Sequence, residues 1–193
     1  MAVTPLTLGT LTWLRAVDRL DLLAEGTAAT LSGWAAVVPE VADAVRVAEI
    51  DPGLADTAAM TGAYDLPLAV SANCVLVSGR RAGEERVAAA VVRATTRADV
   101  NTAVKKLLDV RKASFLPVER AVEESGMEYG GITPLGLPSG YRVLLDAGVA
   151  TADPEAGGTV IIGSGLRRSK LALPGTLLAA APGVEVVEGL ALG

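Results

Sequence analysis

The chain has 193 residues, of which 51% are hydrophobic and 20% charged, with a net charge of −5 and no histidine. This apolar content argues for a packed core and against disorder, and the length suits one domain, or one domain with an appendage. Without histidine, a Ser-His-Asp triad, a Cys-His dyad and a zinc site with a His ligand are all excluded. Any chemistry must use carboxylates, Lys or Arg, hydroxyls, backbone amides or the substrate itself.

The first half of the chain is predicted to hold an arm, helices and a hairpin. Residues 1–38 indicate a short strand or extended arm, followed by an Ala-rich helix that ends near Pro39. The β-branched run 45–50 predicts a strand, after which Asp51 caps a helix that starts at Pro52 and stops before Pro67. Residues 72–78 and 86–94 are predicted to pair as a hairpin, with residues 79–85 as its polar turn.

The second half alternates short strands and helices around a glycine-rich loop. After Asp99, apolar residues at helical spacing predict a helix, and Gly126 is expected to stop another over residues 118–125. Residues 126–140 are a loop by composition. Strands are predicted at 113–116, 142–145, 159–162 and 184–187, with a closing helix near 171–180. This irregular order predicts an α+β fold, with a mixed, largely antiparallel sheet or open barrel and flanking helices.

The single Cys74 lies in an apolar run, where a small buried hydrophobe fits best. The longest uncharged stretches fall short of the ~20 apolar residues of a membrane helix, and prolines interrupt them. We therefore expect no membrane span. The N-terminus has no basic segment typical of a secretory signal, so a cytoplasmic location is the expectation.

Charge is unevenly distributed along the chain. Residues 1–72 hold nine acidic against three basic side chains, whereas residues 80–112 hold nine basic against four acidic ones. A further basic cluster is Arg167, Arg168 and Lys170. Such patches suit phosphate binding, although solvated faces of ordinary helices and strands would give the same pattern.

The triplet Gly163-Ser164-Gly165 follows a predicted strand, as a dinucleotide-binding fingerprint would. The third glycine of that fingerprint is replaced by Arg168, and too little chain follows for a second βαβ unit. A Rossmann site is therefore rejected. A tight turn that brings backbone amides and Arg167 near an anion remains open.

The loop over residues 130–136 is the stronger candidate site. Two consecutive glycines leave backbone amides without side-chain cover, and Pro134 stiffens the exit. Such a nest suits a carboxylate, a phosphate or the oxyanion formed when an ester carbonyl is attacked. The alternative is a purely structural turn between two strands.

Three other side chains have a structural and a functional interpretation. Asp146 follows an apolar strand and would either position a water or amine, or cap a turn. Trp13 and Trp34 lie far in sequence from the basic clusters, so they suit core anchoring better than base stacking.

In this order, the segments resemble the YbaK/prolyl-tRNA-synthetase-associated editing domain family, from about residue 45 to residue 190. The segments that carry the resemblance are the strand at Asn73-Cys74-Val75, Arg97-Ala98-Asp99-Val100, residues 111–115, the loop 126–136, Leu144-Leu145-Asp146 and residues 162–168. The most specific is Gly130-Gly131-Ile132-Thr133-Pro134-Leu135-Gly136, which fits the family's G-x-x-x-P loop.

The resemblance implies a YbaK-like fold and an aminoacyl-tRNA deacylase that acts in trans. Its substrate would be the ester of a small amino acid on tRNA, for instance on proline tRNA, and it would need no metal, cofactor or membrane. The residues implied as catalytic are Asn73, Gly131 and Asp146. The residues implied as substrate-binding are Gly130, Ile132, Thr133, Pro134, Leu135, Gly136, Gly163, Ser164, Gly165, Arg97 and Arg167. On this interpretation Gly131→Val blocks activity without unfolding.

One departure from the family concerns position 73. Catalytic members carry a Lys where this chain has Asn73, which offers hydrogen bonds but no positive charge. Either Arg80, Arg97 or Arg167 replaces that charge in space, or the chain is a non-catalytic protein that binds an aminoacyl or nucleotide ligand. Residues 1–41 are predicted to be an N-terminal extension, and residues 42–193 the editing domain.

Overall fold

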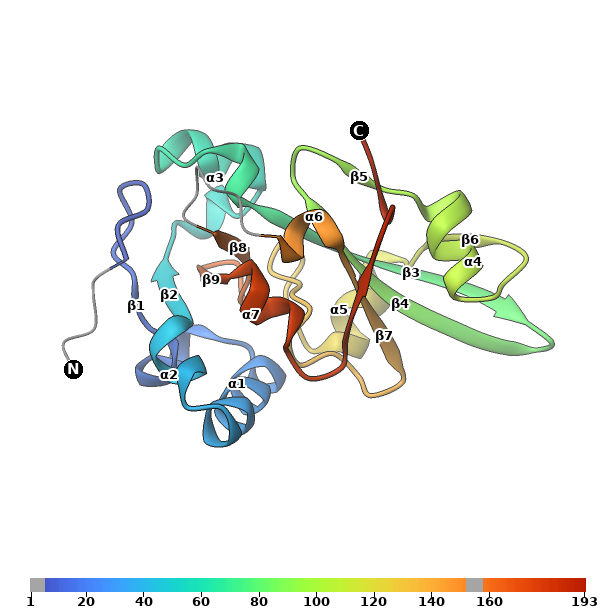
Figure 1. Ribbon diagram of the computed structural model, residues 1–193, viewed down its shortest axis with the longest axis horizontal. Coiled ribbons are helices and arrows are strands. Elements are labelled where there is room, and N and C mark those ends of the chain that lie inside the picture. Colours follow the sequence, from blue (N-terminus) through green and yellow to red (C-terminus); the bar gives the residue numbers. More distant parts are fainter. Residues whose placement is uncertain (1–5, 152–157) are drawn as a thin grey trace.

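Two larger β-sheets and one two-stranded sheet organise the chain, which a computed structural model describes over residues 6–151 and 158–193 (Figure 1). The helices are α1 Glu25–Val37, α2 Glu40–Ala44, α3 Thr57–Ala63, α4 Lys105–Leu107, α5 Val118–Ser125, α6 Ala147–Ala150 and α7 Gly175–Ala179. The strands are β1 Leu14–Arg15, β2 Arg46–Glu49, β3 Ala72–Arg81, β4 Glu84–Arg93, β5 Arg97–Ala98, β6 Ala113–Phe115, β7 Tyr141–Asp146, β8 Thr159–Gly163, β9 Ser169–Pro174, β10 Val184–Val187 and β11 Ala191–Leu192.

The larger sheet has the order β10-β7-β4-β3-β6, and the smaller has the order β1-β2-β9-β8. In the larger sheet β10, β7 and β4 run parallel, whereas β3 is antiparallel to both β4 and β6. The smaller sheet is antiparallel throughout. The predicted α+β fold with a mixed sheet is confirmed, and within the described ranges the sheets do not close into a barrel.

The β3–β4 hairpin is longer than predicted. Its strands pair from Ala72 and Arg93 out to Arg81 and Glu84, so that they project beyond the rest of the sheet (Figure 1). The predicted seven-residue turn was wrong, because the charged residues at the tip continue the strands as solvent-exposed cross-strand pairs. Ala82 and Gly83 alone make the turn, with φ of 52° and 88°, as a tight hairpin requires.

Two predicted helices are shorter and divided. Asp51 caps a 3-10 turn over Pro52–Leu54, and Asp56 then caps α3 as a separate helix. The prediction of a closing helix over residues 171–180 was wrong for its first half. Residues 171–174 belong to the strand β9, and the helix α7 begins only after them. This strand is buried along most of its length, and its short apolar run at residues 171–173 does not distinguish a buried strand from a buried helix.

The N-terminal residues pack into the same core as the sheets. Leu31 and Trp34 of α1 belong to one buried cluster with Ile162 of β8 and Leu171 of β9. Trp13 lies in a second cluster with Ile161, so both tryptophans are core residues as predicted. The boundary at residues 41 and 42 stays a prediction. No helix in the two described ranges has the length and hydropathy needed to cross a membrane.

Candidate functional site

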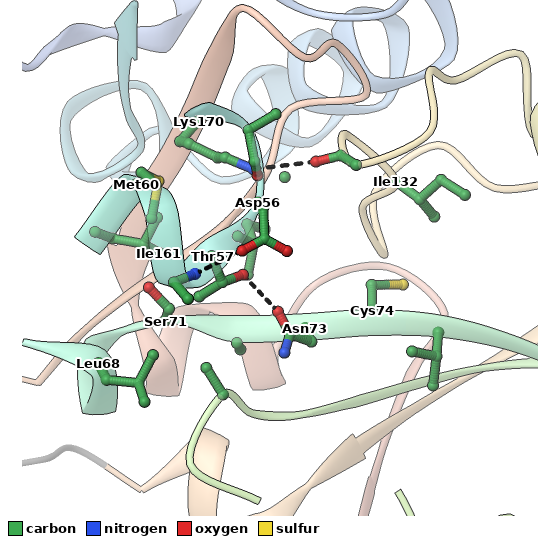
Figure 2. Close-up of a pocket in the computed structure, with 18 of the residues that line it drawn as sticks. Asp56, Thr57, Met60, Leu68, Ser71, Asn73, Cys74, Ile132, Ile161 and Lys170 are labelled. Atoms are coloured by element: carbon green, nitrogen blue, oxygen red, sulfur yellow. Dashed lines mark hydrogen bonds between the residues drawn. The ribbon is translucent and has the colours of Figure 1, made fainter. Parts of the chain in front are cut away.

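A pocket of about 500 Å³ lies where the two sheets meet (Figure 2). A single parallel bridge between Ser71 and Ile161 joins the larger sheet to the smaller one at this point. The start of β3, the N-terminus of α3, the loop around Gly130 and the strands β8 and β9 form its walls. Its polar lining includes Asp56, Thr57, Ser71, Asn73 and Lys170.

Lys170 is a buried cation in the wall of this pocket. It lies on β9, is only 6% exposed, and its Nζ donates to the carbonyl oxygens of Ala55 at 3.0 Å and Gly130 at 3.1 Å. An ammonium group has three donors, and within the described part of the chain the third has no acceptor. Lys170 therefore has one N–H available for a ligand.

Burial, together with the nearby Arg167 guanidinium, lowers the pKa of Lys170 from its ordinary value to about 8. The carboxylate of Asp56 acts in the opposite direction and favours the charged form. The two groups lie too far apart for an ion pair, since no contact within 4.0 Å joins them in the described ranges. Because its pKa of about 8 lies above 7, Lys170 is still largely protonated at pH 7.

Asp56 supplies the negative charge of the pocket. Its Oδ1 accepts from the backbone amides of Ala58 at 3.0 Å and Ala59 at 3.4 Å, which caps α3. Oδ2 accepts no hydrogen bond from the described residues. Figure 2 shows the carboxylate between Lys170 and Asn73, so an open cation donor and an open carboxylate oxygen face one cavity.

Asn73 lines the pocket, and the catalytic role that the resemblance implied for it stays a prediction. Thr57 Oγ1 donates to Asn73 Oδ1 at 2.9 Å, which fixes the side-chain amide across the start of α3 (Figure 2). Asn73 is uncharged, and the positive charge lies instead on Lys170, which reaches the pocket from β9.

Ser71 and Cys74 complete the polar wall, but neither is an activated nucleophile. Ser71 is 2% exposed, and its Oγ has no partner among the described residues. Burial raises the pKa of the Cys74 thiol to about 12, so the thiol stays protonated at neutral pH, and Cys74 is partly buried as expected of a small hydrophobe. No cluster of carboxylates and thiols in the described ranges is arranged to hold a metal ion.

The glycine-rich loop divides into a part that lines the pocket and a part that packs. Gly130 and Ile132 line the cavity, and their amides donate to no group in the described ranges. Gly131, in contrast, donates its amide to the Glu128 carbonyl at 2.9 Å and accepts from Gly165 at 2.7 Å. Gly131 is thus engaged within the fold, and Gly130 and Ile132 hold the free amides.

Gly131 is a position of close backbone approach. A Cβ there would lie 2.7 Å from the carbonyl group of Leu166, and one at Gly163 would lie 2.3 Å from the Gly131 oxygen. A side chain at Gly131 would force these two loops apart. The structure therefore contradicts the expectation that Gly131→Val blocks activity while leaving the fold intact.

The rest of the predicted loop supports the pocket from behind without lining it. Thr133, Pro134 and Leu135 are buried, and Leu135 lies in the main core, where its carbonyl accepts from Thr27 Oγ1 at 3.0 Å. Gly136 has a φ of +86° and packs on the backbone of Gly26. These residues fix the loop against α1.

The triplet at 163–165 also serves mainly to pack two loops together. Gly163 lines the pocket, whereas Ser164 is fully buried and its Oγ lies 2.8 Å from Ser169 Oγ. Arg167 donates to the carbonyls of Tyr129 at 2.8 Å and Pro52 at 2.9 Å, so it braces the wall of the pocket. Arg97 lies in a neighbouring cavity instead.

Asp146 does not line this pocket. Its Oδ1 accepts from the Gly148 amide at 2.9 Å as the N-cap of α6, and its Oδ2 accepts from the Ala191 amide at 3.1 Å. Asp146 therefore caps a turn, which is the structural interpretation offered for it from the sequence.

Four pocket residues were not predicted from the sequence: Lys170, Asp56, Thr57 and Ser71. Lys170 directly precedes the apolar run 171–173, and a charge beside such a run is a candidate inward-facing residue on a strand, but here it also reads as the end of the basic cluster with Arg167 and Arg168. The helix predicted there concealed this signal. Asp56 precedes an Ala-rich segment, as a helix cap does, but nothing local shows that the cap faces a cavity.

Comparisons with known proteins agree with this architecture. A protein proposed to be a trans-editing enzyme for prolyl-tRNA synthetase superposes with a TM-score of 0.67 at 17% identity, covering 89% of this chain and 99% of that chain. A protein described only as hypothetical gives 0.69 at 18% identity, covering 84% and 99%. A scaffold protein used for computational epitope grafting gives 0.67 at 16% identity, covering 89% and 100%. No curated protein matches the sequence.

These structural similarities show a shared fold. The family model of the aminoacyl-tRNA editing domain matches residues 51–180, which include α3, the β3–β4 hairpin, the glycine-rich loop and Lys170. The chain therefore belongs to the aminoacyl-tRNA editing domain family.

Proposed function

We propose that this protein is an aminoacyl-tRNA deacylase that hydrolyses, in trans, the ester of a small amino acid on tRNA, with proline tRNA as the first acceptor to test. The observation that supports this most is the buried Lys170, whose free N–H faces the same cavity as the open oxygen of Asp56. An aminoacyl ester carries an α-ammonium group and a carbonyl oxygen, which complement these two charges.

In the proposed reaction Asp56 holds the α-ammonium group. The Lys170 ammonium and the Gly130 amide face the carbonyl oxygen, where negative charge develops as water attacks the carbonyl carbon. The bond from that carbon to the ribose oxygen then breaks. One proton of the attacking water goes to the ribose oxygen, so the products are the free amino acid and an intact tRNA end.

The other polar side chains of the pocket bear on the choice of nucleophile. Cys74 stays protonated, and no histidine is available to activate it or Ser71, so water is the nucleophile in this proposal. Thr57 fixes Asn73 at the rim, where an amide suits the hydroxyl groups of the terminal ribose.

The test is a deacylation panel with purified protein. Proline tRNA charged with alanine, cysteine or serine, and the cognate prolyl-tRNA, are each incubated with the protein, and release of the amino acid is followed. We expect at least one small-residue ester to be hydrolysed and prolyl-tRNA to be spared. If every ester stays intact at high protein concentration, the proposal is wrong.

The pH dependence of the reaction should follow Lys170. Because its pKa is lowered to about 8, kcat/KM should be level below that pH and fall about tenfold per pH unit above it. Lys170→Arg retains its charge to much higher pH, so any activity it keeps should lack this falling limb. Titration of the substrate's own ammonium group would affect the wild type and Lys170→Arg equally. If both proteins show the same falling limb, Lys170 is not the group that titrates.

The free energy of unfolding should also depend on pH through the titration of Lys170. Between pH 8 and the ordinary lysine value of 10.5, the unfolded chain binds a proton at Lys170 that the folded chain has released. The free energy of unfolding relative to Lys170→Met is therefore expected to rise with pH across this window.

Asn73→Lys distinguishes this proposal from a non-catalytic binding protein that has lost its lysine. Since Lys170 already supplies the charge, a second ammonium next to it would repel it and disturb the contact between Thr57 and Asn73. We expect deacylation to fall. A gain of hydrolysis in Asn73→Lys, starting from an inactive protein, would favour the binding protein.

A further inference from the structure

A second cavity adjoins the ester pocket across β3. Its volume is about 530 Å³, and Asn73 and Val75 line both cavities. The other walls come from the end of β4, the segment after it, β6 and β11, and they contribute Arg97, Asn101 and Phe115. The first cavity contains the open charges of Lys170 and Asp56, whereas the second combines an aromatic ring with a guanidinium group.

Phe115 is an unusual residue for a surface position. It is the only phenylalanine of the chain and is 61% exposed on the short edge strand β6, where it pairs with Val77. An exposed aromatic ring beside a cavity offers a face on which a planar ligand can stack.

Arg97 provides an unsatisfied positive charge in the same cavity. Its guanidinium forms no ion pair or side-chain hydrogen bond within the described part of the chain. Asp99 in the same wall caps the following turn by accepting from the Thr102 amide at 3.0 Å, and its negative charge partly offsets that of Arg97. The cavity therefore suits a ligand that has a flat apolar face and a negative charge.

We propose that the second cavity binds the terminal adenosine of the tRNA, with the base stacked on Phe115 and the 5′ phosphate at Arg97. This inference rests on the proposed function and adds a nucleoside subsite to it. In an aminoacyl ester a single ribose separates the base from the carbonyl carbon, so the subsite must adjoin the ester pocket. Asn73 lines both cavities, at the place where the ribose would cross from one to the other.

The test uses AMP as a probe of the full chain, with binding measured by titration calorimetry. AMP is expected to bind, and ribose 5-phosphate, which lacks the base, far more weakly. Phe115→Ala should weaken AMP binding about five- to a hundred-fold, the range of one lost stacking contact. Arg97→Ala should also weaken it and reduce its salt dependence. Val186→Ala, at another exposed apolar position, should bind AMP as the wild type does.

Phe115→Ala should also lower kcat/KM more for aminoacyl-tRNA than for the ethyl ester of the same amino acid, which has no base. Because the ring is mostly exposed, the variant should keep its thermal midpoint. Equal AMP affinity in wild type and Phe115→Ala, or no AMP binding at all, would overturn the subsite while leaving the deacylation panel to decide the function. AMP binding that depends on Phe115, in a protein that spares every tRNA ester, would support the subsite and refute the deacylase.

Discussion

Replacing Lys170 by Met is expected to lower kcat for ester hydrolysis about 100- to 1000-fold, the range seen when one donor to a developing oxyanion is removed. Met retains the length and apolar stem of Lys170 but has no N–H to offer the carbonyl oxygen. The loss should appear mainly in kcat, because the charge on that oxygen grows as the transition state is approached.

The variant should remain folded. Removing a buried cation relieves the burial penalty that lowers its pKa, and the two carbonyls it leaves, of Ala55 and Gly130, border a cavity that water can enter. Lys106→Met, on the exposed face of α4, is the matched control and should retain wild-type activity. Near-normal kcat in a folded Lys170→Met protein would remove Lys170 from the mechanism.

Local patterns predicted most of the fold. Gly126 takes a φ of +66° and ends α5, and the apolar run at residues 72–78 forms the buried part of β3. These features depend on neighbours in sequence, such as a glycine that tolerates left-handed backbone or alternation along one strand. The error at β9 has the opposite origin, since tertiary burial on both sides determined that this run is a strand.

The site was harder to predict because it depends on contacts between distant segments. Asn73 was identified only through the resemblance to the editing family, and Lys170 meets it because β9 pairs with β8 and the bridge from Ser71 to Ile161 joins the sheets. Composition also could not separate Gly130, which faces the cavity, from Gly131, which packs against Leu166. The two adjacent glycines have different roles, and which one packs and which one lines the cavity depends on the opposing loop that contains Leu166.

Substituting Asp56 by Asn should raise KM for aminoacyl-tRNA about tenfold and leave the fold intact. Asn is as good an N-cap as Asp, so α3 should keep its start, while the ion pair with the substrate ammonium is lost. The effect is modest for a charged contact because Asp56 is exposed to solvent, which screens it. Deacylation kinetics at several substrate concentrations give KM and kcat separately.

A second readout distinguishes this role from a structural one. Asp56 favours the charged form of Lys170, so in Asp56→Asn the pKa of Lys170 should fall further and the falling limb of the pH profile should move to lower pH. Asp51→Asn is the matched control, because Asp51 also caps a helical turn, accepting from the Gly53 amide at 2.7 Å, but does not line the pocket. If Asp51→Asn and Asp56→Asn change KM and the pH profile alike, the effect comes from capping, and the ammonium of the substrate must be held elsewhere.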